Sequence, residues 1–238
     1  MTLPVAILAG GLATRMRPLT TSIPKSMIEV AGRPFVAHQL EFLKREGVTK
    51  VVMLVGYLGE QIEAFVGDGA GFGVGVSYCH DGDVLRGTGG ALRAALPDLG
   101  SAFLVLYGDS YLDAPIAPIE REWRRSGMPA LMTVFQNNDH FDRSNVVFTD
   151  GRIEVYDKAI RDPRMKHIDY GLGVVSEVAF AGAGPDPLDL AAIYRDLAQQ
   201  GHLAGFAVED RFFEIGTPQG LRETEERLVS RQQQKPLQ

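Results

Sequence analysis

Three cations stand close together near the start of the chain, in "ILAGGLATRMRPLTTSIPKSM". Arg15, Arg17 and Lys25 follow an apolar run that stops at two glycines, and no acidic residue lies among them. Gly10 and Gly11 can adopt positive φ and let backbone N–H groups approach a ligand, as glycine loops do around phosphate oxygens. The stretch predicts a cradle for a strongly anionic group. A plain glycine turn between a strand and a helix would also explain the two glycines taken alone.

A second candidate site residue is Asp109, whose carboxylate could bind a metal ion. Asp109 follows the apolar run "FLVLY", and its carboxylate suits Mg²⁺, which prefers one or two carboxylates together with phosphate oxygens. The alternative is that Asp109 caps a turn after the strand. The five histidines show no metal-ligand spacing, and Ser110 lacks the G-x-S-x-G context of a hydrolase.

The elements that would position these residues alternate along the chain. Apolar runs rich in valine and leucine predict buried strands at 5–9, 51–55, 103–107 and 130–135. Between the first two strands, "PFVAHQLEFLKREG" has helical period, with Pro34 at its start and Gly47 as its stop. Strand alternating with helix predicts a Rossmann-like α/β fold, a mostly parallel sheet with helices on both faces. Ligands of such sheets bind beyond the carboxyl ends of the strands, where the glycine loop and Asp109 both fall.

The pattern loosens after about residue 140. The segment "NVVFTDGRIEVY" predicts a hairpin that turns at Asp150 and Gly151, and helices are expected near 187–199 and 218–231. We see no long linker and no internal repeat. The expected organisation is therefore a single domain over 1–230 and a polar tail over 231–238.

Composition excludes several classes of function. The chain has 238 residues, 45% of them hydrophobic, and a net charge of -6, so a broad basic surface for nucleic acid is not expected. A single cysteine excludes an internal disulfide, and the start of the chain carries no basic and apolar signal segment, which together favour the cytoplasm. No apolar run approaches the roughly 18 residues needed to span a bilayer.

The motifs together resemble the signature of sugar-1-phosphate nucleotidyltransferases. That signature is usually L-A-[AG]-G-x-G-[TS]-R-[LM]-x-P-L-T followed by P-K, and this chain has "LAGGLATRMRPLT" and "IPKSM". The segments "GTGGAL", "GDS", "DK" and "FFEIGTP" follow in the family's order. The resemblance implies a GT-A-like nucleotidyltransferase fold and an Mg²⁺-dependent reaction in which a sugar 1-phosphate and an NTP give NDP-sugar and pyrophosphate.

The resemblance also implies roles for the charged residues. Arg15 would hold the departing phosphates, and Lys25 would bridge the α-phosphate and the incoming group. Asp109 would bind Mg²⁺ with Glu214 as its second ligand, at a position where the family usually has aspartate. The nucleotide would contact the first glycine loop and the segment "HDGDVLRGTGGAL", through Leu8, Ala9, Gly10, Gly11, Asp81, Asp83, Gly87, Thr88, Gly89 and Gly90.

The sugar phosphate would lie farther along the chain. Lys158 matches the lysine of the family's E-K signature, with Asp157 in place of the glutamate, and would clamp the sugar phosphate. Asp169 and Gly171, in "DYGLGVVS", would contact sugar hydroxyls. The alternatives are that Asp157 and Lys158 are solvated charges at a strand end and that Asp169 is a turn residue.

The identity of the substrates stays open at this point. The chain looks most like mannose- or heptose-1-phosphate guanylyltransferases, in which Asp81 or Asp83 could accept from guanine N1–H and N2–H₂. The alternative is a uridylyltransferase acting on N-acetylmuramate 1-phosphate or another hexose 1-phosphate. The segment "HDGDVLRGTGGAL" is one residue longer than the family's common form, with Arg86 extra, so both GTP and UTP stay open as substrates. A nucleotide-sugar-sensing subunit of the same fold is the non-enzyme alternative. We expect a monomer or a homodimer.

Overall fold

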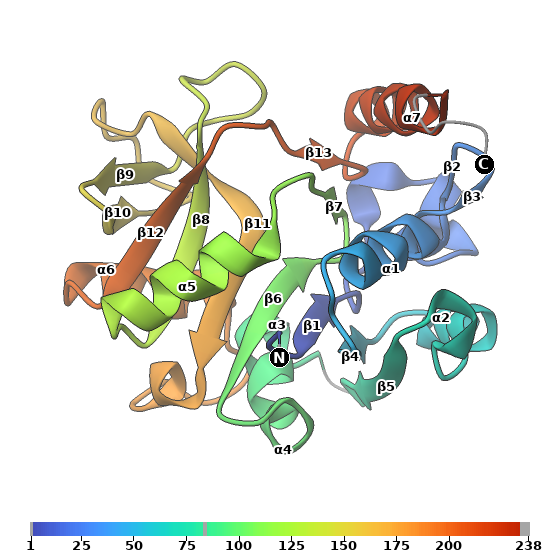
Figure 1. Cartoon of the computed structure of the whole chain (residues 1–238), viewed down its shortest axis with the longest axis horizontal. Helices are drawn as coiled ribbons and strands as arrows, with labels where there is room; N and C mark the ends of the chain where they lie inside the picture. Colours follow the sequence, from blue (N-terminus) through green and yellow to red (C-terminus); the bar gives the residue numbers. More distant parts are fainter. Residues whose placement is uncertain (1, 83–84, 234–238) are drawn as a thin grey trace.

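A nine-stranded sheet runs through the computed structural model, which describes residues 2–82 and 85–233. The strand order is β5-β4-β1-β6-β11-β8-β12-β10-β9 (Figure 1). Its first half consists of four parallel strands: β5 (Gly75–His80), β4 (Lys50–Val55), β1 (Val5–Leu8) and β6 (Ala102–Tyr107). Three of them, β4, β1 and β6, are predicted buried strands, whereas β5 was not predicted and the fourth predicted strand, at 130–135, lies in the second half. All the carboxyl ends of these four strands therefore meet at one edge, as expected from the sequence.

The second half of the sheet is mixed, which corrects the expectation of a mostly parallel sheet. It consists of β11 (His167–Ser176), β8 (Ala130–Gln136), β12 (Leu203–Val208), β10 (Arg152–Tyr156) and β9 (Val146–Thr149). β11 is antiparallel to both β6 and β8, whereas β12 runs parallel to β8. β9 and β10 form the predicted hairpin, and β9 also pairs with β11, so these five strands close into a ring. β9 and β10 are joined by a local chain reversal, whereas β11 pairs with β6 and β8 across long stretches of the sequence.

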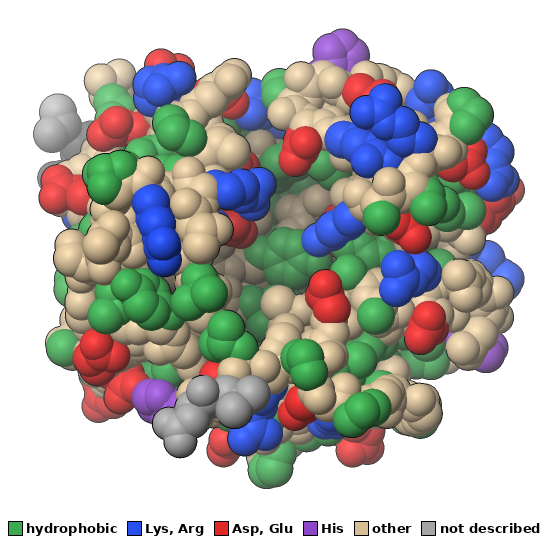
Figure 2. Space-filling model, turned by 180° about the vertical axis from the view of Figure 1, so that it is seen from behind, with side chains coloured by type: hydrophobic (Ala, Val, Ile, Leu, Met, Phe, Trp, Pro, Cys, Tyr) green, Lys and Arg blue, Asp and Glu red, His purple; other side chains and the backbone are tan. Residues whose placement is uncertain are grey.

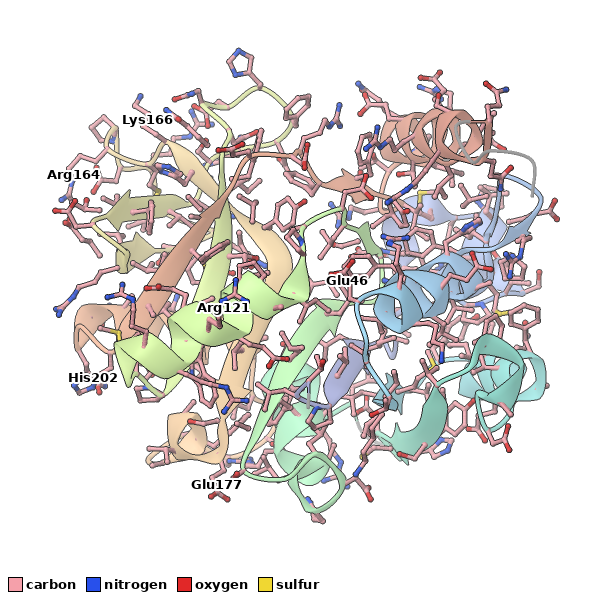
Figure 3. All side chains as sticks on the ribbon, viewed as in Figure 1. Glu46, Arg121, Arg164, Lys166, Glu177 and His202 are labelled. Atoms are coloured by element: carbon pink, nitrogen blue, oxygen red, sulfur yellow. The ribbon has the colours of Figure 1, made fainter. Side chains whose placement is uncertain are left out.

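Helices cover both faces of the sheet, as predicted. One core layer joins the sheet to α1 (Phe35–Arg45), α2 (Gly59–Val66) and α5 (Ile116–Ser126). The opposite layer holds α3 (Gly87–Ala94), α4 (Leu96–Leu99) and α6 (Leu190–Gln199). Glu46 follows α1 and accepts a hydrogen bond from Ile116 N at 3.2 Å, so it fixes the start of α5 (Figure 3).

Short elements join the last helix to the first loop of the chain. Two small sheets, β2 (Glu29–Val30) with β3 (Arg33–Pro34) and β7 (Ser110–Tyr111) with β13 (Phe213–Glu214), lie beside α7 (Pro218–Gln233) (Figure 1). A satellite core packs them together through Met16, Ile28, Val30, Phe35, Tyr111, Ile215 and Leu228. This cluster anchors the basic loop through Met16 and brings β13 next to the loop after β6.

Several connections contain a 3₁₀ turn, at Thr14–Met16, Leu19–Thr21, Lys25–Met27, Ala70–Phe72 and Glu177–Phe180. α7 continues to Gln233, past the expected domain boundary at 230. Within the described ranges, no helix is both long and apolar enough to cross a membrane.

Candidate active site

A cavity of about 340 Å³ lies at the carboxyl ends of β1, β4 and β6. Seen from behind, the molecule is hollowed at its centre, with hydrophobic side chains in the hollow and charged ones around it (Figure 2). Many predicted site residues line the cavity: Leu8, Ala9, Gly10, Gly11, Lys25, Asp81, Gly87, Thr88, Asp109 and Lys158. Further lining residues, which the sequence did not predict, include Ser26, Leu85, Tyr107 and Asp189.

Lys25 and Asp109 meet at the floor of this cavity. Lys25 Nζ lies 3.0 Å from Asp109 Oδ2, and the two side chains are only 18% and 29% exposed. Asp109 comes two residues after the end of β6, and Gly108 between them passes very close to β1. The Gly108 N–H donates to Leu8 O at 3.1 Å, and a Cβ at this position would collide with that carbonyl. The fold therefore places a cation against a carboxylate 84 residues away in the sequence.

A buried glutamine holds the loop that carries Asp109. Gln39, on α1, is 1% exposed, and its Nε2 donates to Tyr107 O at 3.0 Å and to Ser110 O at 2.9 Å. These two carbonyls flank Gly108 and Asp109, so one side chain fixes both ends of the loop. No sequence pattern singles out Gln39, because it lies on the buried face of an ordinary amphipathic helix.

Glu214 lies beside Asp109 because β13 pairs with β7. Ile215 N donates to Asp109 O at 3.0 Å, and the Glu214 and Asp109 carboxylates lie 2.5 and 3.4 Å from the point that a Cβ at Gly216 would occupy. Glu214 also accepts hydrogen bonds from Gly216 N and, at 2.7 Å, from Thr217 Oγ1. Thr217 in turn accepts from Gly220 N at 3.0 Å and caps α7.

The two carboxylates fit a divalent ion of the magnesium type. A carboxylate has about four lone-pair sites, so the bonds to Gly216 and Thr217 leave Glu214 able to bind a cation. Groups of three or more His, Cys, Asp or Glu with metal-binding spacing are absent from the described residues. Mg²⁺ needs only one or two carboxylates when phosphates and water supply the rest.

Arg15 lies near the Asp109 and Glu214 carboxylates. It is exposed and lies on the 3₁₀ turn Thr14–Met16, and its Nη2 is 3.6 Å from the same point beside Gly216. Arg15 and Glu214 do not belong to the cavity lining described above. They therefore sit outside the cavity, next to Asp109, and Arg17 is exposed on the same loop.

The glycine-rich segment 87–90 forms part of one wall of the cavity. Its residues have two different roles, which the sequence did not predict. Gly87 and Thr88 line the cavity, whereas Gly89 N and Gly90 N donate to Leu188 O at 2.8 and 3.1 Å. The amides of these two glycines therefore hold the segment before α6 and do not face the cavity. The same contact places Asp189 in the wall, where it accepts a hydrogen bond from Thr88 Oγ1 at 2.8 Å.

Of the two predicted base-reading acids, Asp81 lies inside the cavity and Asp83 is outside the described residues. The Asp81 carboxylate rests against the glycine loop, with Oδ2 3.2 Å from the point that a Cβ at Gly10 would occupy. Burial raises the pKa of the Asp81 carboxyl above its ordinary value, and the Arg86 guanidinium offsets this only in part. Because of the short distance to Oδ2, a side chain at Gly10 would crowd the Asp81 carboxylate.

Of the four predicted sugar-phosphate residues, Asp157, Lys158, Asp169 and Gly171, only Lys158 lines the cavity. Asp157 Oδ1 accepts from Ala159 N at 2.6 Å and from Ile160 N at 3.1 Å, and the Ala159 hydrogen bond is the main cause of its lowered pKa. Asp169 Oδ2 accepts from Tyr107 and Tyr156, and Oδ1 accepts from Gly171 N. Asp157 is thus a turn residue in this structure, and the oxygens of Asp169 bind protein groups.

These features identify the class of protein. Residues 5–145, more than half of the chain, match the family model described as Nucleotidyl transferase, and the chain belongs to this family. Among curated relatives, an N-acetylmuramate alpha-1-phosphate uridylyltransferase from Neisseria meningitidis serogroup B is 43% identical over 108 residues, which cover 45% of this chain and 47% of that protein. A mannose-1-phosphate guanyltransferase beta-B from Xenopus laevis is 28% identical over 222 residues, covering 89% of this chain and 61% of that protein.

Solved structures agree on the fold. HddC from Yersinia pseudotuberculosis, solved in complex with GMP-PN, has a TM-score of 0.79 at 22% identity and covers 95% of this chain and 100% of its own. The matched regions span about half to three fifths of the length of the curated relatives. The fold is thus the α/β fold of sugar nucleotidyltransferases.

Proposed function

We propose that this chain is a sugar-1-phosphate nucleotidyltransferase that uses Mg²⁺ and converts a sugar 1-phosphate and an NTP to NDP-sugar and pyrophosphate. The observation that carries the proposal is the Lys25–Asp109 pair, 3.0 Å apart, in a cavity that the glycine loop also lines. Such a cavity offers a fixed cation, backbone amides and a carboxylate to a triphosphate, which phosphoryl-type transfer requires. The family membership and the names of the relatives support the same reaction.

In the proposed reaction, an oxygen of the sugar phosphate attacks the α-phosphorus, and the bond to the β-phosphate oxygen breaks. The Gly10–Gly11 loop would bind the phosphates, and Lys25 would face the α-phosphate, where charge grows in the transition state. Arg15 would neutralise the departing pyrophosphate, and Lys158 would bind the sugar's phosphate. A bound Mg²⁺, held by Asp109 and Glu214, would supply further charge neutralisation. None of these side chains needs to gain or lose a proton.

We infer that the base is guanine and the sugar is of mannose or heptose type. Asp81 lies in the cavity and offers the acceptor that guanine N1–H and N2–H₂ require. ITP lacks only the 2-amino group, so GTP should be the better substrate, because an unpaired acidic acceptor is costly. A uridylyltransferase is the second candidate, favoured by the 43% identity to the N-acetylmuramate alpha-1-phosphate enzyme.

The test is a pyrophosphate-release assay with GTP, ITP and UTP against a panel of hexose, heptose and N-acetylmuramate 1-phosphates. Release with GTP above ITP supports the guanylyl assignment, whereas equal use of both or a preference for UTP removes it. No release with any pair would favour the sensing subunit. As a site control, Lys25→Ala should lower kcat sharply, whereas Lys158→Ala should raise KM for the sugar phosphate about 10- to 100-fold, the loss of a hydrogen bond to a charged group.

A further inference from the structure

A cluster of tyrosines lies directly beneath Lys158. The Lys158 ammonium sits 5.5 Å from the centre of the Tyr107 ring and 5.9 Å from that of the Tyr156 ring. Lys158 itself is exposed, and Tyr107 and Lys158 both line the cavity. A cation over an aromatic face is attracted by the ring's quadrupole. The two rings therefore mark one preferred position for a long, flexible side chain.

Asp169 fixes the two rings from below. Its Oδ2 accepts from Tyr107 Oη at 2.7 Å and from Tyr156 Oη at 3.2 Å, and its Oδ1 accepts from Gly171 N at 3.0 Å. Asp169 thus ties together the ends of β6 and β10, which carry Tyr107 and Tyr156.

The backbone around Asp169 is shaped for this contact. The pairing of β11 with β8 shifts register between Asp169 and Gly173, and Gly171 has φ of 88°. A side chain at Gly171 would meet Ser110 Oγ at 2.7 Å. Irregularities of this kind turn a side chain out of its regular position, and they concentrate next to functional sites. The register shift lies beside the side chain that bonds both phenols.

We infer that Asp169, Tyr107 and Tyr156 are positioning residues, which act on the sugar phosphate through Lys158. This inference rests on the proposed function. Asp169 orients the phenols, and their ring faces hold the ammonium at the cavity wall before substrate arrives. Pre-ordering a lysine reduces the side-chain entropy lost when it binds a phosphate. The role differs from direct recognition of a sugar hydroxyl by Asp169, because hydrogen bonds from protein groups already fill three of the roughly four acceptor sites of its carboxylate.

The kinetic test compares single and double variants. Asp169→Asn should raise KM for the sugar 1-phosphate about fivefold, or about 1 kcal/mol at 1.4 kcal/mol per tenfold, and leave KM for NTP unchanged. The double variant Asp169→Asn with Lys158→Ala should be no worse than Lys158→Ala alone, since the effect passes through Lys158. A further fivefold rise in the double variant would show that Asp169 acts on the sugar itself and would overturn the inference.

A second test needs no substrate, so its failure is distinct from failure of the proposed function. The chain has six lysines, which can be labelled by reductive ¹³C-methylation and assigned by single Lys→Arg substitutions. The Lys158 signal should show an upfield ring-current shift, which Tyr156→Phe should reduce only in part, because the ring face remains but its hydrogen bond to Asp169 is lost. Tyr156→Leu and Asp169→Asn should reduce the shift, and Tyr194→Phe is the matched control, because Tyr194 packs edge-on to Tyr156 at 6.1 Å. An unshifted Lys158 signal in the unsubstituted protein would refute the arrangement.

Discussion

Replacing Lys25 by methionine should strengthen metal binding while it abolishes turnover. The ammonium lies 3.0 Å from Asp109 Oδ2 and competes with any divalent ion for that carboxylate. Methionine keeps the length and the apolar stem of the side chain and removes the charge. The variant therefore separates two roles of Lys25, as a partner of Asp109 in the free protein and as a partner of the phosphates in the proposed reaction.

The size of the effect follows from the distance and the burial. At 3.0 Å the attraction of two unit charges is about 1.4 kcal/mol in a medium as polar as water and about 5.5 kcal/mol at an effective dielectric constant of 20. Loss of hydration and of side-chain freedom offsets much of this for a pair that is 18% and 29% exposed, which leaves about 1 to 2 kcal/mol. The affinity for a divalent ion should therefore rise about 5- to 30-fold.

The assay is a titration with Mn²⁺ in the absence of nucleotide, in which the free ion is measured by electron paramagnetic resonance. Arg33→Met is the matched control, since it removes a cation from the exposed pair with Glu41, whose side chains are 43% and 46% exposed. The Arg33→Met variant should bind Mn²⁺ with the same affinity as the unsubstituted protein. Unaltered or weaker binding of Mn²⁺ by the Lys25→Met variant would refute the assignment of Asp109 as a metal ligand in competition with Lys25.

Three further outcomes are expected. Asp109→Asn should lower turnover at least 100-fold, about 2.7 kcal/mol of barrier, with an unchanged circular dichroism spectrum, and activity within threefold of the parent would contradict this. Gln39→Leu should lower the free energy of unfolding in urea by about 2 to 4 kcal/mol, because the Tyr107 and Ser110 carbonyls both lose a buried donor. Burial lowers the pKa of His38 below its ordinary value of 6.5. As the pH falls through 6.5, the unfolded chain therefore binds a proton at His38 more readily than the folded protein does, and the free energy of unfolding should decrease. His38→Gln should make the fall shallower, and an equal slope in both proteins would exclude His38 as its cause.

The sequence predicts the first half of the fold well because the signals there are local. The apolar runs of β1, β4 and β6 are short and continuous, and parallel strands of this kind bring Gly10 and Asp109 to one edge. The closing of the ring depends on the pairing of His167 with Val146, for which periodicity gives no signal.

The candidate site shows the same limit. Lys25 and Asp109 follow from charge and position, but the pairing of β13 with β7 that brings Glu214 beside Asp109 is a long-range contact. A sequence motif also does not show which of its hydrogen-bonding groups will be bonded to other parts of the protein instead of to a ligand. The Gly89 and Gly90 amides bind Leu188 O, and the Asp169 carboxylate binds two phenols. Asp189 leaves only the weak signal of an aspartate before an apolar helix, and it is indeed the N-cap of α6.

The bond between Glu214 and Thr217 links the stability of α7 to the binding of a ligand at the Asp109–Glu214 carboxylate pair. Thr217 Oγ1 donates to Glu214 and accepts from Gly220 N, so opening of the first turn of α7 would loosen one of the hydrogen bonds that hold the carboxylate beside Asp109. A ligand that binds the ordered carboxylate pair must therefore make this opening rarer. Amide hydrogens of the first turn, such as that of Gly220, should exchange with deuterium more slowly when a divalent ion such as Mn²⁺ occupies the carboxylate pair. The far end of the helix is tied down separately by Arg227 and Arg231 on Asp113, so the slowing should fade along its length.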